Sequence, residues 1–238
     1  MLIDFHTHIL PEMDDGAQSV EESLEMLRML KAQGVKTVCL TPHYLAMDES
    51  PDQFLARREE SYQKLKSAID ESGEEFPKLL LGAEVFYYPG ICKMEELRKL
   101  TLQGTDLLLL EMPSSRWSEY TLKELEELYS NTGILIVIAH IERYLDLQKK
   151  DTLERLFMGG VGTQVNASFF ISKRTRRKAL KMFKLSHIGF IGTDCHNIKY
   201  RPPRMSEALQ IIRDSKKIPE PVIDDYIKNL ENVINNSF

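Results

Sequence analysis

Residues 2–8 read LIDFHTH, a short apolar run that ends in two histidines, and similar runs recur along the chain. Longer stretches with helical spacing separate these runs, which is typical of βα units and a parallel sheet. Strands are predicted at residues 2–8, 36–40, 79–85, 106–112, 134–140, 163–166 and 188–193. Strands in this number fit either an open, doubly wound sheet or a closed, irregular barrel, and the count alone does not decide between them.

The stretches between the strands predict helices. In residues 19–33, Ser19 and Glu22 fit a capping box, and Gly34 supplies a stop after the last turn. The other predicted helices are residues 51–72, 120–130, 152–158, 173–183, 204–214 and 219–235. Because the linkers between these elements are short, all 238 residues are expected to form a single domain.

The composition argues against several classes of protein. With 42% hydrophobic residues the chain can bury a sizeable core, and its formal net charge of −5 argues against general attraction to nucleic acid. No stretch approaches the roughly 18 apolar residues of a membrane span, and the first residues do not fit a signal peptide. Since three cysteines suit a reducing compartment, we expect a cytoplasmic protein that meets membranes only through a partner.

Histidines and carboxylates gather at the predicted strand ends, where chemistry gathers in parallel α/β folds. A lone histidine there is more often structural than a ligand, but here five of the six histidines occupy this position. Several carboxylates at one edge repel one another unless cations compensate, and imidazoles with carboxylates bind zinc, manganese or iron. The sequence therefore predicts a multinuclear metal site from His6, His8, Asp14 or Asp15, His43, Glu84, Glu111, His140, Asp194 and His196.

The order of the motifs resembles the polymerase and histidinol phosphatase (PHP) superfamily. The motifs are DFHTH, DDG, TPH, GAE, LLLLE, AHIER and GTDCHN, and they run from the first strand to about Met205. Within the superfamily, the chain is most similar to the bacterial protein-tyrosine phosphatases of capsular and exopolysaccharide operons, the CpsB/YwqE type. This resemblance implies an α/β fold, a distorted (β/α)7 barrel, with three divalent metal ions at the C-terminal ends of the strands. It favours manganese, with iron, zinc or magnesium as alternatives.

The resemblance also divides the ligands among the three ions. It implies that the first ion is held by His6, His8, Glu84 and Asp194. The second ion shares Glu84 and adds Glu111 and His140. The third is held by Asp15, His43 and His196, with Asp14 as the rival of Asp15. A glutamate at position 111 is what the resemblance implies for the tyrosine-phosphatase branch, whereas the histidinol-phosphatase branch has a histidine near this position.

Two arginines lie just past metal-ligand positions. Phosphate-ester hydrolysis needs cations on the non-bridging oxygens, and the resemblance supports a catalytic, phosphate-binding role for Arg143 and Arg201. Arg116 is a weaker third candidate, which together with Trp117 could instead form the rim that meets the substrate. Asp4, on the histidine face of its strand, is either an acceptor that orients an imidazole or a polar residue at the strand start.

Other features are interpreted as structural. Cys92 and Arg98 have the C-x5-R spacing of cysteine-dependent tyrosine phosphatases, but the intervening KMEEL lacks the glycine-rich loop that cradles a phosphate. Cys39 is expected in the core, Cys195 is expected to point away from the metals, and His187 is expected to be structural.

The run KRTRRKALKMFK, residues 173–184, concentrates basic charge in an acidic protein. It is either a solvated helix face or a docking surface for an acidic partner or an anionic membrane. If it is a docking surface, reversing the charges of Arg174, Arg176 and Arg177 is expected to weaken hydrolysis of a protein substrate and to leave hydrolysis of a small aryl phosphate unchanged.

Together these features predict a metal-dependent protein-tyrosine phosphatase. A hydroxide that bridges two ions would attack phosphorus in line, while the ions and the two arginines neutralise the phosphate oxygens. The resemblance implies that the substrate is the tail of an autophosphorylating kinase that regulates capsule or exopolysaccharide synthesis. The alternatives are a small-molecule phosphatase acting on histidinol phosphate, a phosphoesterase acting on nucleic acid, and a metal-stabilised module that binds phosphoproteins without turnover.

Overall fold

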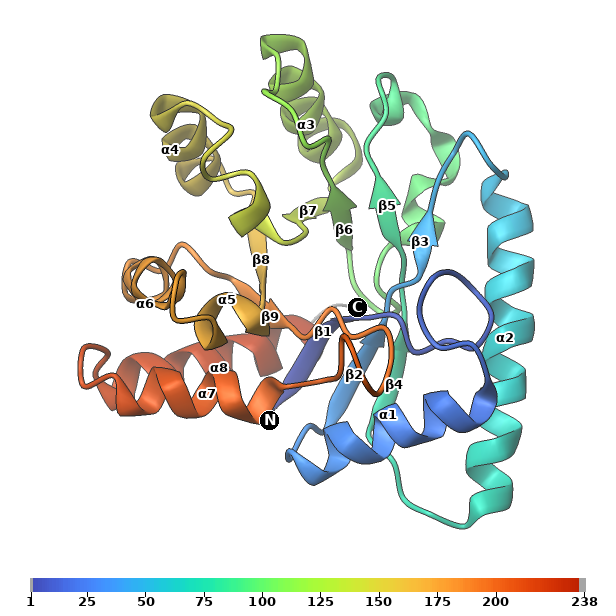
Figure 1. Ribbon diagram of the computed structural model, residues 1–238. Coiled ribbons are helices and arrows are strands. Elements are labelled where there is room, and N and C mark those ends of the chain that lie inside the picture. The colour runs from blue at the N-terminus through green and yellow to red at the C-terminus, as the bar shows by residue number, and fades with distance from the viewer. Residues whose placement is uncertain (1, 236–238) are drawn as a thin grey trace.

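The fold is built on two all-parallel sheets that together form a curled half-barrel, with helices packed around it (Figure 1). The structure is a computed structural model and describes residues 2–235. Its first sheet has the order β1 (Ile3–Thr7), β2 (Thr37–Leu40) and β4 (Lys78–Leu81). The second has the order β3 (His43–Tyr44), β5 (Glu84–Phe86), β6 (Leu107–Glu111), β7 (Leu135–Ile138), β8 (Gly162–Asn166) and β9 (Phe190–Gly192).

One of the predicted strands is broken by a bend, and one short strand was not predicted. The prediction of one strand over residues 79–85 is wrong, because β4 ends before Gly82 and β5 pairs in the other sheet. A Cβ atom at Gly82 would lie 3.3 Å from Thr41 and Leu102 side-chain atoms, so a glycine eases the close approach at the bend. The strand that was not predicted is β3, which follows β2 closely in the chain but pairs in the second sheet. As a result His43 and Glu84 pair directly in register at the start of the second sheet.

The two sheets meet where β1 of the first lies against β9 of the second. The amide of Asp194 donates to the carbonyl of His6 at 2.8 Å, and the amide of His8 donates to that of Cys195 at 3.0 Å. A Cβ atom at Gly192 would lie 2.5 Å from the Cβ atom of His6, so a glycine is needed where β9 approaches β1. The predicted distorted barrel is confirmed, and the ends of β1 and β9 share one edge of it.

Helices join the strands on the outside of the sheet. Ser19 caps α1 (Val20–Ala32) by accepting from the amide of Glu22, but the Glu22 side chain accepts from Gln18, so the predicted capping box is only half formed. A complete capping box starts α2 (Pro51–Ser72) at Ser50 and Gln53. The other long helices are α3 (Glu119–Thr132), α4 (Lys150–Met158), α7 (Met205–Asp214) and α8 (Glu220–Asn235).

The predicted helix at residues 173–183 forms from Arg176 onward, and a short helix that was not predicted precedes it. The chain forms α5 (Ala167–Ile171), turns, and then forms α6 (Arg176–Lys184). Arg176 donates to the carbonyls of Phe170 and Ile171 at 3.0 and 2.8 Å, and thereby satisfies the last carbonyls of α5. Three short 3-10 segments, at Ile91–Lys93, Glu95–Leu100 and Ile141–Arg143, were not predicted.

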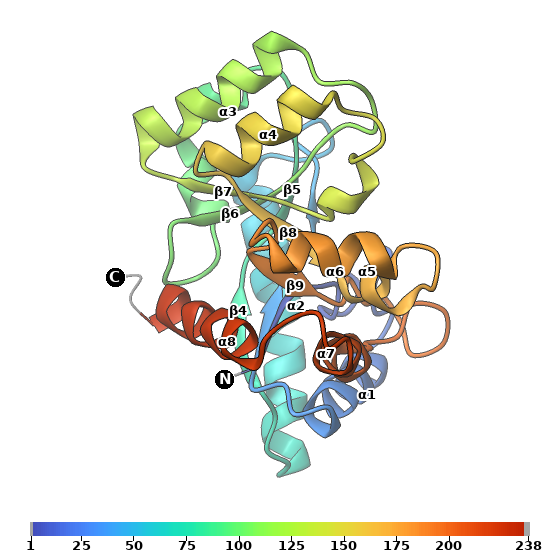
Figure 2. The ribbon, with the colours of Figure 1, turned by 90° about the vertical axis from the view of Figure 1, so that its left-hand side faces the viewer.

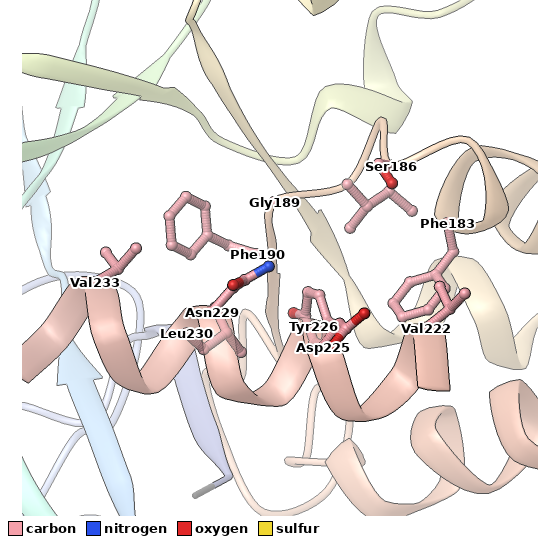
Figure 3. Close-up of a pocket in the computed structure, with 11 residues that line it drawn as sticks. Phe183, Ser186, Gly189, Phe190, Val222, Asp225, Tyr226, Asn229, Leu230 and Val233 are labelled. Atoms are coloured by element: carbon pink, nitrogen blue, oxygen red, sulfur yellow. The ribbon is translucent and has the colours of Figure 1, made fainter. Parts of the chain in front are cut away.

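Two apolar clusters hold these layers together. The larger lies between the sheet and its surrounding helices, and the smaller joins Phe5 and Phe190, whose rings stack at 4.0 Å, to Leu230 of α8. Figure 2 shows α8 beside β9, and the cavity of about 470 Å³ in Figure 3 lies between α8 and the amino end of β9. Within residues 2–235, none of the helices is both long and apolar enough to cross a membrane.

Candidate metal centre

The structure brings the predicted ligands together where β1, β6, β7 and β9 end and where β3 and β5 begin. They come from β1, β3, β5 and β6 and from the loops after β1, β7 and β9. Within the described chain, potential ligand atoms form three groups, each within 4.8 Å. The groups are His8, Asp15, His43 and His196; His6, His8 and Asp194; and His43, Glu84 and Glu111.

The carboxylate of Glu84 lies at the centre of the cluster and is 1% exposed. Its Oε2 atom lies 3.0 Å from Nε2 of His6 and 3.1 Å from Nδ1 of His43. Its Oε1 atom lies 2.9 Å from Nε2 of His140, which is also 3.3 Å from Glu111. The two oxygens of one buried carboxylate therefore face different groups of ligands, an arrangement suited to bridging two cations.

Three of the imidazoles are oriented by contacts behind them. Gln164 lies 3.2 Å from Nδ1 of His6, Asp14 lies 2.7 Å from Nδ1 of His8, and a backbone carbonyl lies 3.0 Å from Nδ1 of His196. An acceptor oxygen at each Nδ1 favours a proton there, which would leave each Nε2 free to bind a metal ion. Gln164 was not predicted as a site residue. A polar side chain in the strand TQVN was its only signal.

The neighbouring aspartates Asp14 and Asp15 occupy different positions. Asp14 accepts from His8 and also from the amides of Gly16 and His43, both at 2.9 Å. Asp15 is 67% exposed, and its Oδ1 atom lies 3.3 Å from Nε2 of His196 and 3.6 Å from Nε2 of His43. Asp15 therefore stands among the ligand atoms, whereas Asp14 stands behind His8.

The donor set fits divalent cations. The Nε2 atom of His196 is buried and has no hydrogen-bond partner among residues 2–235, and the Nε2 atoms of His6 and His8 face one another at 3.0 Å. Buried nitrogens that converge without a shared donor are suited to a metal ion. In addition, the ligands are imidazoles and carboxylates without a thiolate, which suits manganese, iron or zinc.

The pKa values of the imidazoles reflect the surrounding negative charge. Burial lowers the pKa of His140, but hydrogen bonds to Glu111 and Glu84 outweigh burial and raise it to about 9. Burial and the neighbouring His8 instead lower the pKa of His196 to about 4, which keeps this ring neutral and able to bind a metal. Cations bound here would offset the excess negative charge of the carboxylates around His140.

Two proposed ligand positions have left-handed backbone conformations. The φ angle is +32° at His140 and +52° at Asp194, in a region that residues other than glycine rarely adopt. Such strain costs about 1–3 kcal/mol per residue and clusters at functional sites. At both positions the chain leaves a strand and turns its side chain into the cluster.

Arg143 and Arg201 meet at the edge of the cluster. One terminal nitrogen of each guanidinium contacts Oδ2 of Asp194, at 3.0 and 2.8 Å, and Asn166 donates to the same oxygen at 2.7 Å. Each arginine side chain is still about two-fifths exposed, at 43% and 41%. The two cations therefore border the metal ligands and remain accessible to an anion from solvent.

Two residues have other roles than predicted. Asp4 does not orient an imidazole: it accepts from the amide and hydroxyl of Thr193 at 2.8 and 2.6 Å, because β9 lies against β1. Trp117 is 6% exposed and packs its ring 5.2 Å from that of Tyr144, so it is a core residue and does not form a rim. Arg116 is exposed in the loop between β6 and α3.

The features interpreted as structural contribute no ligand atoms to the three groups. Cys92 lies 3.4 Å from Glu124, and burial together with this carboxylate raises the pKa of its thiol. Arg98 is ion-paired with Asp106, so the pair Cys92 and Arg98 does not form a phosphate loop. His187 stacks on Phe157 at 4.2 Å. The other two cysteines, Cys39 and Cys195, are buried in the apolar clusters.

Comparison with known families gives one match along nearly the whole chain. The family described as "Capsular polysaccharide synthesis, CpsB/CapC" matches residues 2–235. The tyrosine-protein phosphatase CpsB of Streptococcus agalactiae is 29% identical over 253 aligned positions, covering 100% of both chains. The tyrosine-protein phosphatase YwqE of Bacillus subtilis is 30% identical, covering 89% of this chain and 84% of YwqE.

A solved structure has a similar fold. It belongs to a study of YwqE from Bacillus subtilis and CpsB from Streptococcus pneumoniae, which are described as unique metal-dependent tyrosine phosphatases. Its TM-score against this chain is 0.84 at 28% sequence identity, and the alignment covers 100% of this chain and 96% of the other.

Proposed function

The chain belongs to the CpsB/CapC family of capsular polysaccharide synthesis proteins, and we propose that it is a metal-dependent protein-tyrosine phosphatase. The observation that carries this proposal is the convergence of imidazoles and carboxylates around Glu84, bordered by two arginines. The relatives named as tyrosine phosphatases support the same activity. A single domain spanning residues 1–238 would hold the whole site.

We assign the ligands to three divalent ions, for which manganese is our first choice. One ion would be held by His6, His8, Glu84 and Asp194. A second would share Glu84 and would also be held by Glu111 and His140. The third would be held by Asp15, His43 and His196.

The protein's own residues would bind and orient the phosphate. When bound, the ions supply a nucleophile at neutral pH and neutralise charge on phosphorus-bound oxygens. Arg143 and Arg201 border the ligands from two loops, so they can clamp the remaining oxygens of a phosphate. A tyrosine leaving group has a pKa of about 10, so it departs with less help from a general acid than an alkoxide needs.

We further propose that the substrate is a tyrosine-phosphorylated protein in the cytoplasm. An autophosphorylating kinase that regulates capsule or exopolysaccharide synthesis is the candidate, because the matching family is described by capsular polysaccharide synthesis. The three free cysteines fit the reducing compartment this requires.

The test compares three substrates for the protein loaded with manganese: a phosphotyrosine peptide, histidinol phosphate and a phosphodiester. We expect the peptide to be preferred. Chelation and His6→Ala should abolish its hydrolysis, whereas Cys92→Ser should leave the rate unchanged. Preference for another substrate would contradict the proposed function and leave the metal site intact. If Cys92→Ser loses activity while chelation and His6→Ala do not affect it, the metal-dependent mechanism is contradicted.

A further inference from the structure

An apolar groove of about 840 Å³ lies at the same edge of the sheet as the metal centre. Its walls are the loops that follow β3, β5 and β6, which are adjacent strands and lie side by side in Figure 1. The main lining side chains are Tyr44, Met47, Phe86, Tyr88, Met94 and Pro113. Sites of this size and apolar character are typical of places where ligands bind.

The groove is continuous with the proposed metal centre. Leu45 and Glu49 line both the groove and a second depression that contains Asp15 and His43. In the sequence, the lining residue Tyr44 directly follows His43. Phe86 likewise lies two residues after Glu84 in β5, and Pro113 lies two residues after Glu111. A polypeptide whose phosphotyrosine reaches the ligands would therefore have its neighbouring residues next to this groove.

Buried contacts hold one wall of the groove in place. Glu124 of α3 is 2% exposed and accepts from the hydroxyl of Tyr87 at 2.5 Å and from the amide of Gly90 at 2.7 Å. These bonds fix the stretch of chain that joins β5 to the following 3-10 segment. Tyr88 lies in this stretch. A wall anchored in this way loses little conformational freedom when a ligand binds.

The exposed surface of the groove is apolar, with an acidic edge. Met47 is 89% exposed, and the side chains of Phe86 and Tyr88 are only partly buried. The charged residues that line the groove, Glu49 and Glu96, are both acidic, and Glu49 is ion-paired with Arg57. The groove therefore suits apolar side chains and disfavours acidic ones.

We propose that this groove binds apolar side chains next to the phosphotyrosine of a polypeptide substrate, and so sets the sequence preference of the enzyme. This inference rests on the proposed function and adds a specificity site to it. Burying one apolar side chain in the groove is expected to raise kcat/KM by about tenfold over a glycine or serine neighbour. An acidic neighbour is expected to lower kcat/KM.

The test uses the full chain loaded with manganese and peptides that differ only beside the phosphotyrosine. Leucine or phenylalanine neighbours are compared with glycine and serine, and with glutamate. The variants are Met47→Ser and Tyr88→Ser, which we expect to remove most of the preference for apolar neighbours. The matched control is Met158→Ser, because Met158 is similarly exposed, at 87%, and lies at the end of α4. A small aryl phosphate should be hydrolysed equally by all four proteins.

The outcomes separate this inference from the proposed function. If phosphotyrosine peptides are hydrolysed but their neighbours have no effect, or if both groove variants keep the preference, the specificity site is overturned and the phosphatase stands. If no phosphotyrosine peptide is hydrolysed, the proposed function itself fails. Sedimentation of the same proteins tests whether a second copy of the chain occupies the groove instead. A dimer that dissociates in Met47→Ser while peptide preference is unchanged would identify the groove as an interface between copies and overturn the inference.

Discussion

The carboxylate of Asp14 lies 2.7 Å from Nδ1 of His8, whereas the adjacent Asp15 faces Nε2 of His43 and His196. Two identical side chains that are neighbours in the sequence thus have different relations to the proposed metals. Asp15 offers an oxygen to the cluster, and Asp14 fixes the proton and the ring orientation of His8.

Substitution of the two aspartates should therefore have different effects. Asp14→Asn is expected to weaken metal affinity by about 10–100-fold, with activity restored at saturating manganese, because His8 is misoriented but still present. Asp15→Asn removes a proposed ligand, so excess manganese should not restore activity. Metal titration of activity and metal analysis after dialysis measure both effects. Full rescue of Asp15→Asn together with no rescue of Asp14→Asn would reverse the assignment.

Arg143 and Arg201 are expected to act on the phosphate. Replacing either with alanine should lower kcat/KM by about 100-fold or more, the usual effect of removing one donor to a developing anion. Lysine should restore only part of the activity, because it lacks the planar fork that binds two oxygens. The control is Arg116→Ala, an exposed arginine in the β6–α3 loop, which should change kcat/KM far less. Equal losses of kcat/KM in all three alanine variants would mean that Arg116 also binds the phosphate.

Removal of the metals should destabilise the fold. Without cations, the carboxylates of Glu84, Glu111 and Asp194 repel one another in a site where Glu84 is almost fully buried. Ions present at about 100 times their Kd stabilise a protein by about 2.7 kcal/mol, which is about 5–10 °C in Tm for a chain of this size. Calorimetry with and without chelator measures the difference. The His6→Ala variant should show a smaller shift, and an unchanged Tm in the wild type would contradict a metal-filled site.

Much of the metal centre was predictable from the sequence because strand ends are easy to recognise. Apolar runs end at Glu111 and His140, and parallel strands place their carboxyl ends at one edge. The bend at Gly82 was not predictable, because the apolar run continues through it and only the paired sheet reveals the break. The roles of Gln164 and Asp4 were missed because a hydrogen bond between distant strands leaves no periodic signal.

Asp4 is expected to hold Asp194 in place through Thr193. Asp4→Ala removes two hydrogen bonds and leaves the buried amide of Thr193 unpaired, which should cost about 3 kcal/mol of unfolding free energy and weaken metal affinity. Asp4→Asn keeps an acceptor for that amide, and the threonine hydroxyl can rotate, so the loss should be smaller. Denaturant unfolding and metal titration distinguish the two variants. Equal losses would mean that the charge of Asp4 matters more than its hydrogen bonds.

The same carboxyl group predicts a pH dependence. Burial raises the pKa of Asp4 to about 6, although the bonds from Thr193 lower it. In the metal-free protein the folded state then holds this proton more tightly than the unfolded state, so the group's contribution to stability should fall as the pH rises from about 4 to about 6. That part of the pH dependence should be absent in Asp4→Asn. Parallel curves for the wild type and the variant would contradict the raised pKa.

The basic run at residues 173–184 contains one structural arginine among solvated ones. Arg176 donates two charged hydrogen bonds to the last carbonyls of α5, whereas Arg174 and Arg177 are exposed. Arg176→Ala is therefore expected to lower the unfolding free energy by about 2 kcal/mol, and alanine at Arg174 or Arg177 by less than about 0.5 kcal/mol. Thermal unfolding measures this, and equal shifts in all three variants would contradict a special role for Arg176.

This difference decides how a docking role for the run must be tested. A charge reversal that includes Arg176 would damage α5 and lower activity for a structural reason. The double variant Arg174→Glu with Arg177→Glu leaves the α5 contacts intact, so it isolates surface charge. Lower kcat/KM on a phosphorylated protein, with unchanged hydrolysis of a small aryl phosphate, would show that the surface attracts an acidic partner. If the double variant and the wild type hydrolyse both substrates at equal rates, the run is a solvated helix face. A surface charge that attracts a protein partner would change the rate on the protein substrate only.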